Sequence, residues 1–296
     1  MASPQPRINQ AAPSVRTLLL TSVTMTFFAA NSLLARFALR AGEIDAAGFT
    51  AVRIVAGSAA LLLLMNFRPE GIAAARGHGS LRAAVALFTY AFTFSFAYLS
   101  LNAGAGALIM FAAVQMTMLG IGIARGERPR PAEWIGLIVA FGGLVYLVSP
   151  GMTAPSTIGV GLMLVSGAAW GYYSLAARDV RSPIAATAGN FTRAAPLAAG
   201  ALGVIWRLGH VHASWFGIGL AAASGAVTSG LGYALWYFTL RGLRTSLAAI
   251  VQLTVPVLAA TAGVILLGER FTWRLALASA AILGGVALAL LQRIRR

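Results

Sequence analysis

The sequence of 296 residues contains no cysteine and no lysine, and it has only three histidines. Without cysteine the chain can form neither a disulfide nor a thiolate metal site, and it has no cysteine nucleophile. It also has no glycine-rich phosphate loop with its lysine, which argues against hydrolysis of ATP. The histidines, His78, His210 and His212, all fall in expected connectors with few acids nearby. We therefore expect no bound metal, no cofactor and no enzymatic activity.

Apolar residues dominate instead. Hydrophobic residues make up 59% of the chain, charged residues only 10%, and the mean hydropathy is +0.81. Several apolar stretches reach the roughly 20 residues that a helix needs to cross a bilayer. The fold class expected is an all-α integral membrane protein with ten transmembrane helices. We place these at residues 17–38, 46–66, 81–101, 104–124, 132–149, 157–177, 185–206, 216–239, 246–267 and 273–291.

Short matches recur in the same order at a fixed spacing of 142 residues. The pairs are Ser32-Leu-Leu-Ala-Arg36 with Ser174-Leu-Ala-Ala-Arg178, Phe49-Thr50 with Phe191-Thr192, Gly126-Glu-Arg128 with Gly268-Glu-Arg270, and Gly142-Gly143 with Gly284-Gly285. Such matches indicate a duplicated unit. We expect a cytoplasmic tail over residues 1–16, one five-helix repeat over 17–150 and a second over 151–296. Because five spans is an odd number, the second repeat is expected to be inverted, and the two to surround a central cavity.

The net charge of +15 comes from 22 basic residues, all arginine, that punctuate the span ends and do not form one patch. This pattern argues against a nucleic-acid partner. With the N-terminus placed in the cytoplasm, far more arginines fall on the cytoplasmic side than on the other, which supports cytoplasmic positions for both termini. The expected partners are the lipid bilayer of a bacterial inner membrane and a small-molecule substrate. The sequence leaves the oligomeric state open and is compatible with a monomer.

The acidic residues are few and shallow. All seven lie in connectors or at span ends; they are Glu43, Asp45, Glu70, Glu127, Glu133, Asp179 and Glu269. Proton-coupled antiporters and exporters of cationic drugs commonly use a carboxylate at membrane depth. The sequence therefore favours a neutral or zwitterionic solute that moves by facilitated diffusion or exchange.

Amides and aromatic rings at membrane depth provide the candidate site. On a helix, the third span carries Tyr90, Phe94 and Tyr98 as one stripe, and these hydroxyls need partners that lipid does not supply. Deep amides likewise need a protein partner or a wet cavity. Ordinary helix packing and helix-to-helix hydrogen bonds are the alternative for each residue. The candidate substrate-binding residues are Asn31, Tyr90, Phe94, Tyr98, Gln115, Trp170, Tyr173, Tyr233 and Gln252.

Four further residues are candidates for gating or for structural anchoring. Arg53 and Arg193 lie about seven residues inside their spans, at nearly corresponding places in the two halves, where an arginine either serves a site or extends to the interface. Pro196 and Pro256 lie within the seventh and ninth expected spans and can kink them. The corresponding first-half positions hold Ile54 and Val114.

The paired halves, the second-span arginines and the Gly-Glu-Arg elements together resemble the drug/metabolite transporter superfamily with paired EamA domains, over about residues 17–291. The aromatic spans further resemble bacterial aromatic amino acid exporters. The resemblance implies a basket of ten helices that exports amino acids or related metabolites by alternating access. It also implies a capping or loop role for Gly268-Glu269-Arg270 and its counterpart. The family's fourth-span proline is matched by Pro256 but not in the first half.

Two alternatives stay open at this stage. One is a transporter for another class of solute, such as nucleotide sugars, purines or drugs. The other is a membrane scaffold or lipid-handling protein that has no aqueous path.

Overall fold

The computed structural model describes residues 15–124, 126, 131–151, 154–176, 180, 182–240 and 251–294. The regular secondary structure of these residues is helical, with short connectors between the helices and one isolated bridge between Ile44 and Ala213. The helices of the first half are α1 (Val15–Arg40), α2 (Ala46–Asn66), α3 (Ala73–Gly77), α4 (Leu81–Ala97), α5 (Ala103–Ala124) and α6 (Pro131–Val148). Those of the second half are α7 (Thr157–Ala176), α8 (Pro183–Arg207), α9 (Trp215–Ala223), η1 (Ser224–Leu231), α10 (Gly232–Leu240), α12 (Thr254–Leu267) and α13 (Trp273–Ile294).

Helix bounds agree closely with the apolar stretches, and the third span is an α-helix as expected. Asp45 and Ser80 cap the N-termini of α2 and α4 through their side chains. One boundary was wrong: the third span was expected to reach residue 101, but α4 ends at Ala97. The carbonyls of Tyr98 and Leu99 accept hydrogen bonds from the Arg36 guanidinium, in place of amides further along the chain.

The eighth and ninth expected spans are not plain α-helices. The eighth is continuous from α9 to α10, but its centre, η1, is a π-helix. In the ninth, helical residues 251 and 252 are separated by a turn at Leu253 from α12, whose first turn contains Pro256. Proline has no amide hydrogen for the preceding turn, which accounts for an interruption here. Residues 246–250 of that expected span lie outside the described residues.

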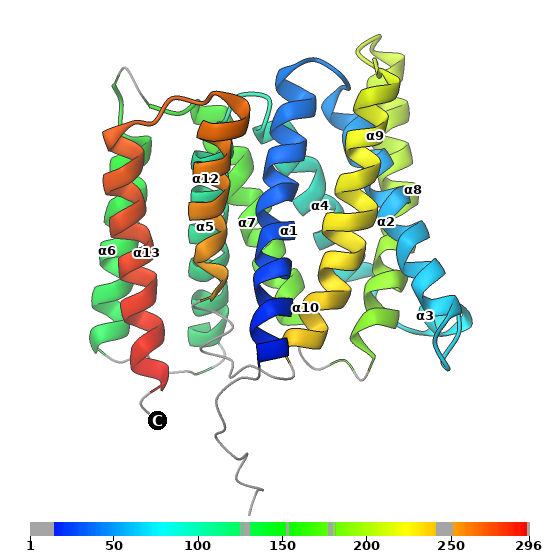
Figure 1. Ribbon diagram of the computed structural model, residues 1–296, viewed down its shortest axis with the longest axis horizontal. Helices are drawn as coiled ribbons and strands as arrows, with labels where there is room; N and C mark the ends of the chain where they lie inside the picture. The colour runs from blue at the N-terminus through cyan, green and yellow to red at the C-terminus, as the bar shows by residue number, and fades with distance from the viewer. Residues whose placement is uncertain are drawn as a thin grey trace, which may run out of the picture.

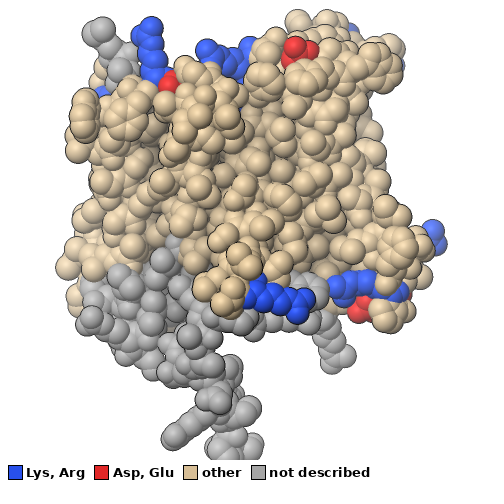
Figure 2. Space-filling model, in the orientation of Figure 1, with Lys and Arg blue, Asp and Glu red and all other residues tan. Residues whose placement is uncertain are grey.

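The surface is that of a membrane protein. Five segments of the described chain combine the length and apolar character needed to cross a bilayer: α1, α2, α5, α7 and Trp215–Trp236. Shorter apolar helices are Leu81–Ala97, Trp134–Val148, Thr254–Leu267 and Trp273–Leu288. In the face drawn in Figure 2, charged side chains gather at the two ends and the band between them is uncharged. Trp206, Trp215 and Trp273 are exposed near helix ends, where tryptophan favours the headgroup region.

The helices stand side by side and run alternately up and down (Figure 1). α1 begins and α13 ends at the same end of the molecule. α7 packs against both α4 and α5, α2 packs against α8 and η1, and α1 packs against α12 and the α9–α10 segment. α6 and α13 pair at one side. The expected tail up to residue 14 lies outside the described residues.

Glycines allow the closest of these contacts. A Cβ atom at Gly167 would lie 2.5 Å from the carbonyl oxygen of Met110, and one at Gly171 would lie 3.1 Å from that of Val114. The G-x-x-x-G of α7 therefore brings that helix against α5, as such motifs do in membranes. These two glycines therefore serve the packing of α7 against α5.

Candidate functional site

A small pocket lies in the interior between α1, α4, α5, α7 and the η1–α10 segment. Its lining residues come from both halves of the chain: Phe28, Asn31, Ser32, Tyr90, Phe94, Met110, Phe111, Trp170, Thr228, Ser229 and Tyr233. The wall is therefore part aromatic and part hydroxyl and amide. Such a mixture holds the apolar part of a ligand while a few polar groups fix its orientation.

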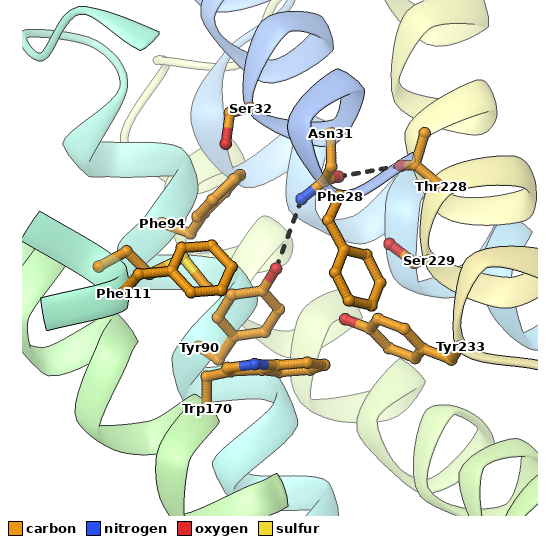
Figure 3. A pocket seen from close by; sticks show the side chains of 11 residues that line it. Phe28, Asn31, Ser32, Tyr90, Phe94, Phe111, Trp170, Thr228, Ser229 and Tyr233 are labelled. Atoms are coloured by element: carbon orange, nitrogen blue, oxygen red, sulfur yellow. Dashed lines mark hydrogen bonds between the residues drawn. The ribbon is translucent and has the colours of Figure 1, made fainter. Parts of the chain in front are cut away.

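Trp170 is the centre of the aromatic wall. Its ring centroid lies 4.8 Å from that of Tyr90, 4.9 Å from that of Tyr233 and 5.5 Å from that of Tyr173. Figure 3 shows the Trp170 ring across the base of the pocket, with Tyr90 and Tyr233 above it. Phe28 meets Tyr233 edge-on at 6.0 Å. These rings fix one another, so the wall is preorganised for a flat or apolar group.

Asn31 organises the polar wall (Figure 3). Its Oδ1 accepts hydrogen bonds from the hydroxyls of Ser224, at 2.7 Å, and Thr228, at 3.2 Å. Its Nδ2 donates to the hydroxyl oxygen of Tyr90 at 3.4 Å. Both hydroxyl partners of Oδ1 belong to η1. The π-helix thus turns Ser224 and Thr228 toward α1, and such segments are frequent at functional sites.

Arg53 of α2 lies against this wall and is only 2% exposed. Its Nη2 donates to the Tyr90 hydroxyl at 2.7 Å, and its Nε donates to Ser229 Oγ at 3.2 Å. Its Cζ lies 5.0 Å from the ring centroids of both Tyr90 and Phe94. Glycine permits this arrangement, because a Cβ at Gly225 would lie 2.1 Å from the carbonyl oxygen of Arg53.

The pocket is contracted. Its cavity measures about 20 Å³, which is enough for one or two water molecules. A solute the size of an amino acid would fit only after the surrounding helices had moved apart. The structure therefore describes a closed form of this site.

The pocket brings together five of the nine candidate substrate-binding residues, Asn31, Tyr90, Phe94, Trp170 and Tyr233. The other four are not among its lining residues. Tyr98 is buried against Phe94, with ring centroids 4.7 Å apart. Tyr173 stacks behind Trp170 and accepts a hydrogen bond from Asn190. Gln115 and Gln252 are half-buried outside the lining.

The two candidate arginines occupy different environments. Arg193 Nη1 donates to the carbonyl oxygen of His78 at 2.7 Å, and its Nη2 donates to that of Arg76 at 2.8 Å. It therefore anchors the connector around α3 to α8, whereas Arg53 lies behind the pocket wall and bonds to two lining residues, Tyr90 and Ser229. Pro196 lies inside α8, and Pro256 lies in the first turn of α12.

Sequence reasoning did not select six lining residues: Phe28, Ser32, Met110, Phe111, Thr228 and Ser229. Phe28 and Ser32 lie three residues before and one after Asn31, so a helical face drawn around Asn31 would have included Phe28. Thr228 and Ser229 depend on η1, for which the sequence offers only a run of small residues.

A second cluster of polar side chains lies at one end of the molecule. Arg36 Nε lies 3.3 Å from Glu269 Oε1, and the guanidinium also donates to the Tyr98 carbonyl at 2.9 Å and to Asn102 Oδ1 at 3.3 Å. The Glu269 carboxylate accepts from the Ala103 amide, the first of α5, at 2.9 and 3.0 Å. This confirms a capping role for the second Gly-Glu-Arg element. Its counterpart, Glu127 and Arg128, and the matching Arg178 lie outside the described residues.

Comparisons with known proteins agree with this architecture. The model of the EamA-like transporter family matches residues 157–291. The chain is also 48% identical over 284 residues to "Uncharacterized protein PA1977" of Pseudomonas aeruginosa, covering 96% of this chain and 98% of that protein. A solved structure described as "Crystal structure of protein" has a TM-score of 0.67 at 20% identity, over 95% of this chain and 99% of the other. That likeness concerns the fold alone.

Proposed function

The chain belongs to the EamA-like transporter family of the drug/metabolite transporter superfamily, and on this premise we propose that it exports amino acids, aromatic ones in particular, or related small metabolites by alternating access. Membership makes it a multi-pass membrane protein that transports small solutes and points away from catalysis. The pocket is the observation that supports export of amino acids or related metabolites. Aromatic rings of α4, α7 and α10 face hydroxyl and amide groups of α1 and η1 there.

The proposed architecture is ten spans arranged as two inverted five-helix repeats. Two observations support it. α1, the first helix of one half, and α7, the first helix of the other, run in opposite directions (Figure 1). Gly143 and Gly285, which are 142 residues apart, occupy matching places in the α6–α13 pair: a Cβ at Gly143 would meet Ala281 and Ile282, and one at Gly285 would meet Gly136 and Ala140.

We place the protein in the bacterial inner membrane with both termini in the cytoplasm, since arginine is concentrated at that end. The end closed by Arg36 and Glu269 is then periplasmic. The described carboxylates, Glu43, Asp45, Glu70 and Glu269, all lie near the ends of the bundle. Transport by facilitated diffusion or exchange follows, since none of these four provides a proton-carrying group at membrane depth.

Transport into reconstituted vesicles tests this function. The panel consists of aromatic amino acids, cationic drugs and nucleotide sugars, each measured with and without a pH gradient. We expect saturable transport of the amino acids that does not require the gradient. Preferential transport of a cationic drug or a nucleotide sugar would contradict the substrate assignment, and no transport of any solute would favour a scaffold.

Two tryptophan variants link that activity to the pocket. Trp170→Ala removes the ring that contacts Tyr90 and Tyr233. Since an aromatic contact adds about 1 kcal/mol beyond area burial, we expect a loss of affinity of about fivefold or more for an aromatic solute. Trp206→Ala is the matched control, because Trp206 is 68% exposed at the end of α8. Equal affinities in the two variants would contradict the site.

A further inference from the structure

Arg53 carries a buried charge that has no counter-ion among the residues that the structure describes. Its Nη1 atom has no hydrogen-bond partner among the described residues, although Nη2 and Nε are both bonded. The ion pair found in the described part of the chain is Arg36 with Glu269, at one end of the bundle. A guanidinium does not lose its proton in proteins, and an unpaired buried charge is costly unless something compensates it. The site thus retains a positive charge that an anion would neutralise.

Two hydroxyls beside Arg53 accept hydrogen bonds from nitrogen donors. The Tyr90 hydroxyl oxygen already receives hydrogen bonds from Arg53 Nη2 and Asn31 Nδ2. Ser229 Oγ receives one from Arg53 Nε. A hydroxyl that accepts still has its own hydrogen to give; Ser229 can direct this hydrogen to a ligand, whereas the Tyr90 hydroxyl also interacts with the hydroxyl of Tyr233. The acceptor of Asn31 is used by Ser224, and it is also contacted by Thr228, whose single hydrogen is shared with the Ser224 carbonyl.

We propose that Arg53, Tyr90 and Ser229 bind a single carboxylate of the transported solute, while its apolar or aromatic part lies against Trp170 and Tyr233. This inference rests on the proposed transport function, because it assigns the substrate chemistry of the same pocket. Nη1 belongs to the guanidinium whose other nitrogens already contact two pocket hydroxyls. A carboxylate that accepts from those hydroxyls therefore comes within reach of Nη1 and of a charge-assisted hydrogen bond.

The single positive charge beside the pocket determines which charged groups a solute can carry. One arginine with one unused nitrogen matches a group of charge −1, whereas the diphosphate of a nucleotide sugar brings more charge than the pocket can neutralise. An ammonium group gains little here, since the lining residues include no carboxylate and the guanidinium repels a cation. The carboxylate is therefore required, and an ammonium group is dispensable.

Three probes that share a phenyl ring separate these requirements in the unmodified protein. Phenylalanine carries both charged groups, 3-phenylpropionate only the carboxylate, and phenethylamine only the ammonium. Titration calorimetry on the purified protein in detergent measures the three dissociation constants. We expect 3-phenylpropionate and phenylalanine to bind, and phenethylamine to bind at least tenfold more weakly. Phenethylamine binding as tightly as 3-phenylpropionate would overturn the inference but leave transport standing. Absence of binding by all three would overturn both proposals.

Arginine variants test the residue itself. Arg53→Gln should weaken 3-phenylpropionate binding ten- to a hundredfold, the range for a hydrogen bond to a charged group, and leave phenethylamine unchanged or improved. Arg193→Gln is the matched control, because Arg193 is also a helix arginine but binds backbone carbonyls outside the pocket. If Arg53→Gln does not fold, Arg53→Lys keeps the charge, and it should retain part of the selectivity for 3-phenylpropionate over phenethylamine. Full wild-type affinity for 3-phenylpropionate in Arg53→Gln would overturn the assignment.

Discussion

Arg36 and Glu269 are 233 residues apart in the sequence and form an ion pair of 3.3 Å with both side chains almost wholly buried. The pair joins the end of α1 to the connector after α12, and Glu269 also caps α5. In a transporter that works by alternating access, these contacts would have to break whenever this end opens. We infer that the pair acts as a lock on the form that is closed at this end.

Glu269→Gln should release that lock. The amide retains the shape of the side chain but loses the charge, and breaking a buried ion pair costs about 3 kcal/mol. We expect a lower melting temperature in detergent and a larger population open at this end. Glu70→Gln is the control, because Glu70 is exposed in a turn. A melting temperature equal to that of the control would show that the pair contributes nothing to the closed form.

Gly225→Ala should disrupt the support of Arg53. Its methyl group would lie 2.1 Å from the Arg53 carbonyl oxygen, so η1 would have to move away from α2. We expect lower thermal stability and loss of carboxylate binding. Gly219→Ala, in the same span, meets no atom within 4 Å and should be neutral or slightly stabilising, since alanine favours helix. The pair of melting curves checks this, and coincident curves would count against the close approach.

Asn31→Asp should supply the missing counter-ion. An aspartate can still accept from Ser224 and Thr228, but it places a negative charge within hydrogen-bond reach of the Tyr90 hydroxyl, which Arg53 also contacts. We expect the affinity for 3-phenylpropionate to fall at least tenfold and that for phenethylamine to rise. Asn31→Leu is the comparison, since it removes the amide without adding charge. If Asp and Leu have the same effect on both probes, the charge balance of the pocket does not set its selectivity.

The sequence predicted the helices well because the bilayer fixes their length. The expected stretch 46–66 coincides with α2. Prediction failed where local contacts override that rule. The end of α4 depends on Arg36, a residue distant in sequence. The π-helix of Ser224–Leu231 depends on hydroxyl partners in α1 and a close approach to α2, neither of which hydropathy records.

The residues that line the pocket were predicted in part, and the depth of each side chain explains which of them were found. An amide such as that of Asn31, or a ring such as that of Trp170, requires a partner when it lies at membrane depth. The depth predicted from the sequence is therefore enough to identify it as a candidate. Serine and threonine can bond to their own helix, as Thr228 does with the Ser224 carbonyl, so their depth carries no such signal. The difference between Arg53 and Arg193 has a geometric cause. They are 140 residues apart against a repeat of 142, and two residues turn about 200° around a helix.

The central claim is that the pocket is a solute site which opens to water. The accessibility of residue 32 to a thiol reagent tests this claim most directly. Because the chain has no cysteine, Ser32→Cys would provide a single thiol in the pocket lining. Ser95→Cys is the matched control, since Ser95 is buried and bonded to Thr50 and the Ala91 carbonyl outside that lining. A membrane-impermeant thiol reagent is applied to vesicles of each orientation, with and without 3-phenylpropionate. We expect Ser32→Cys to react from both sides and to be protected by the solute, while Ser95→Cys stays unreactive. Failure of Ser32→Cys to react from either side would contradict the account.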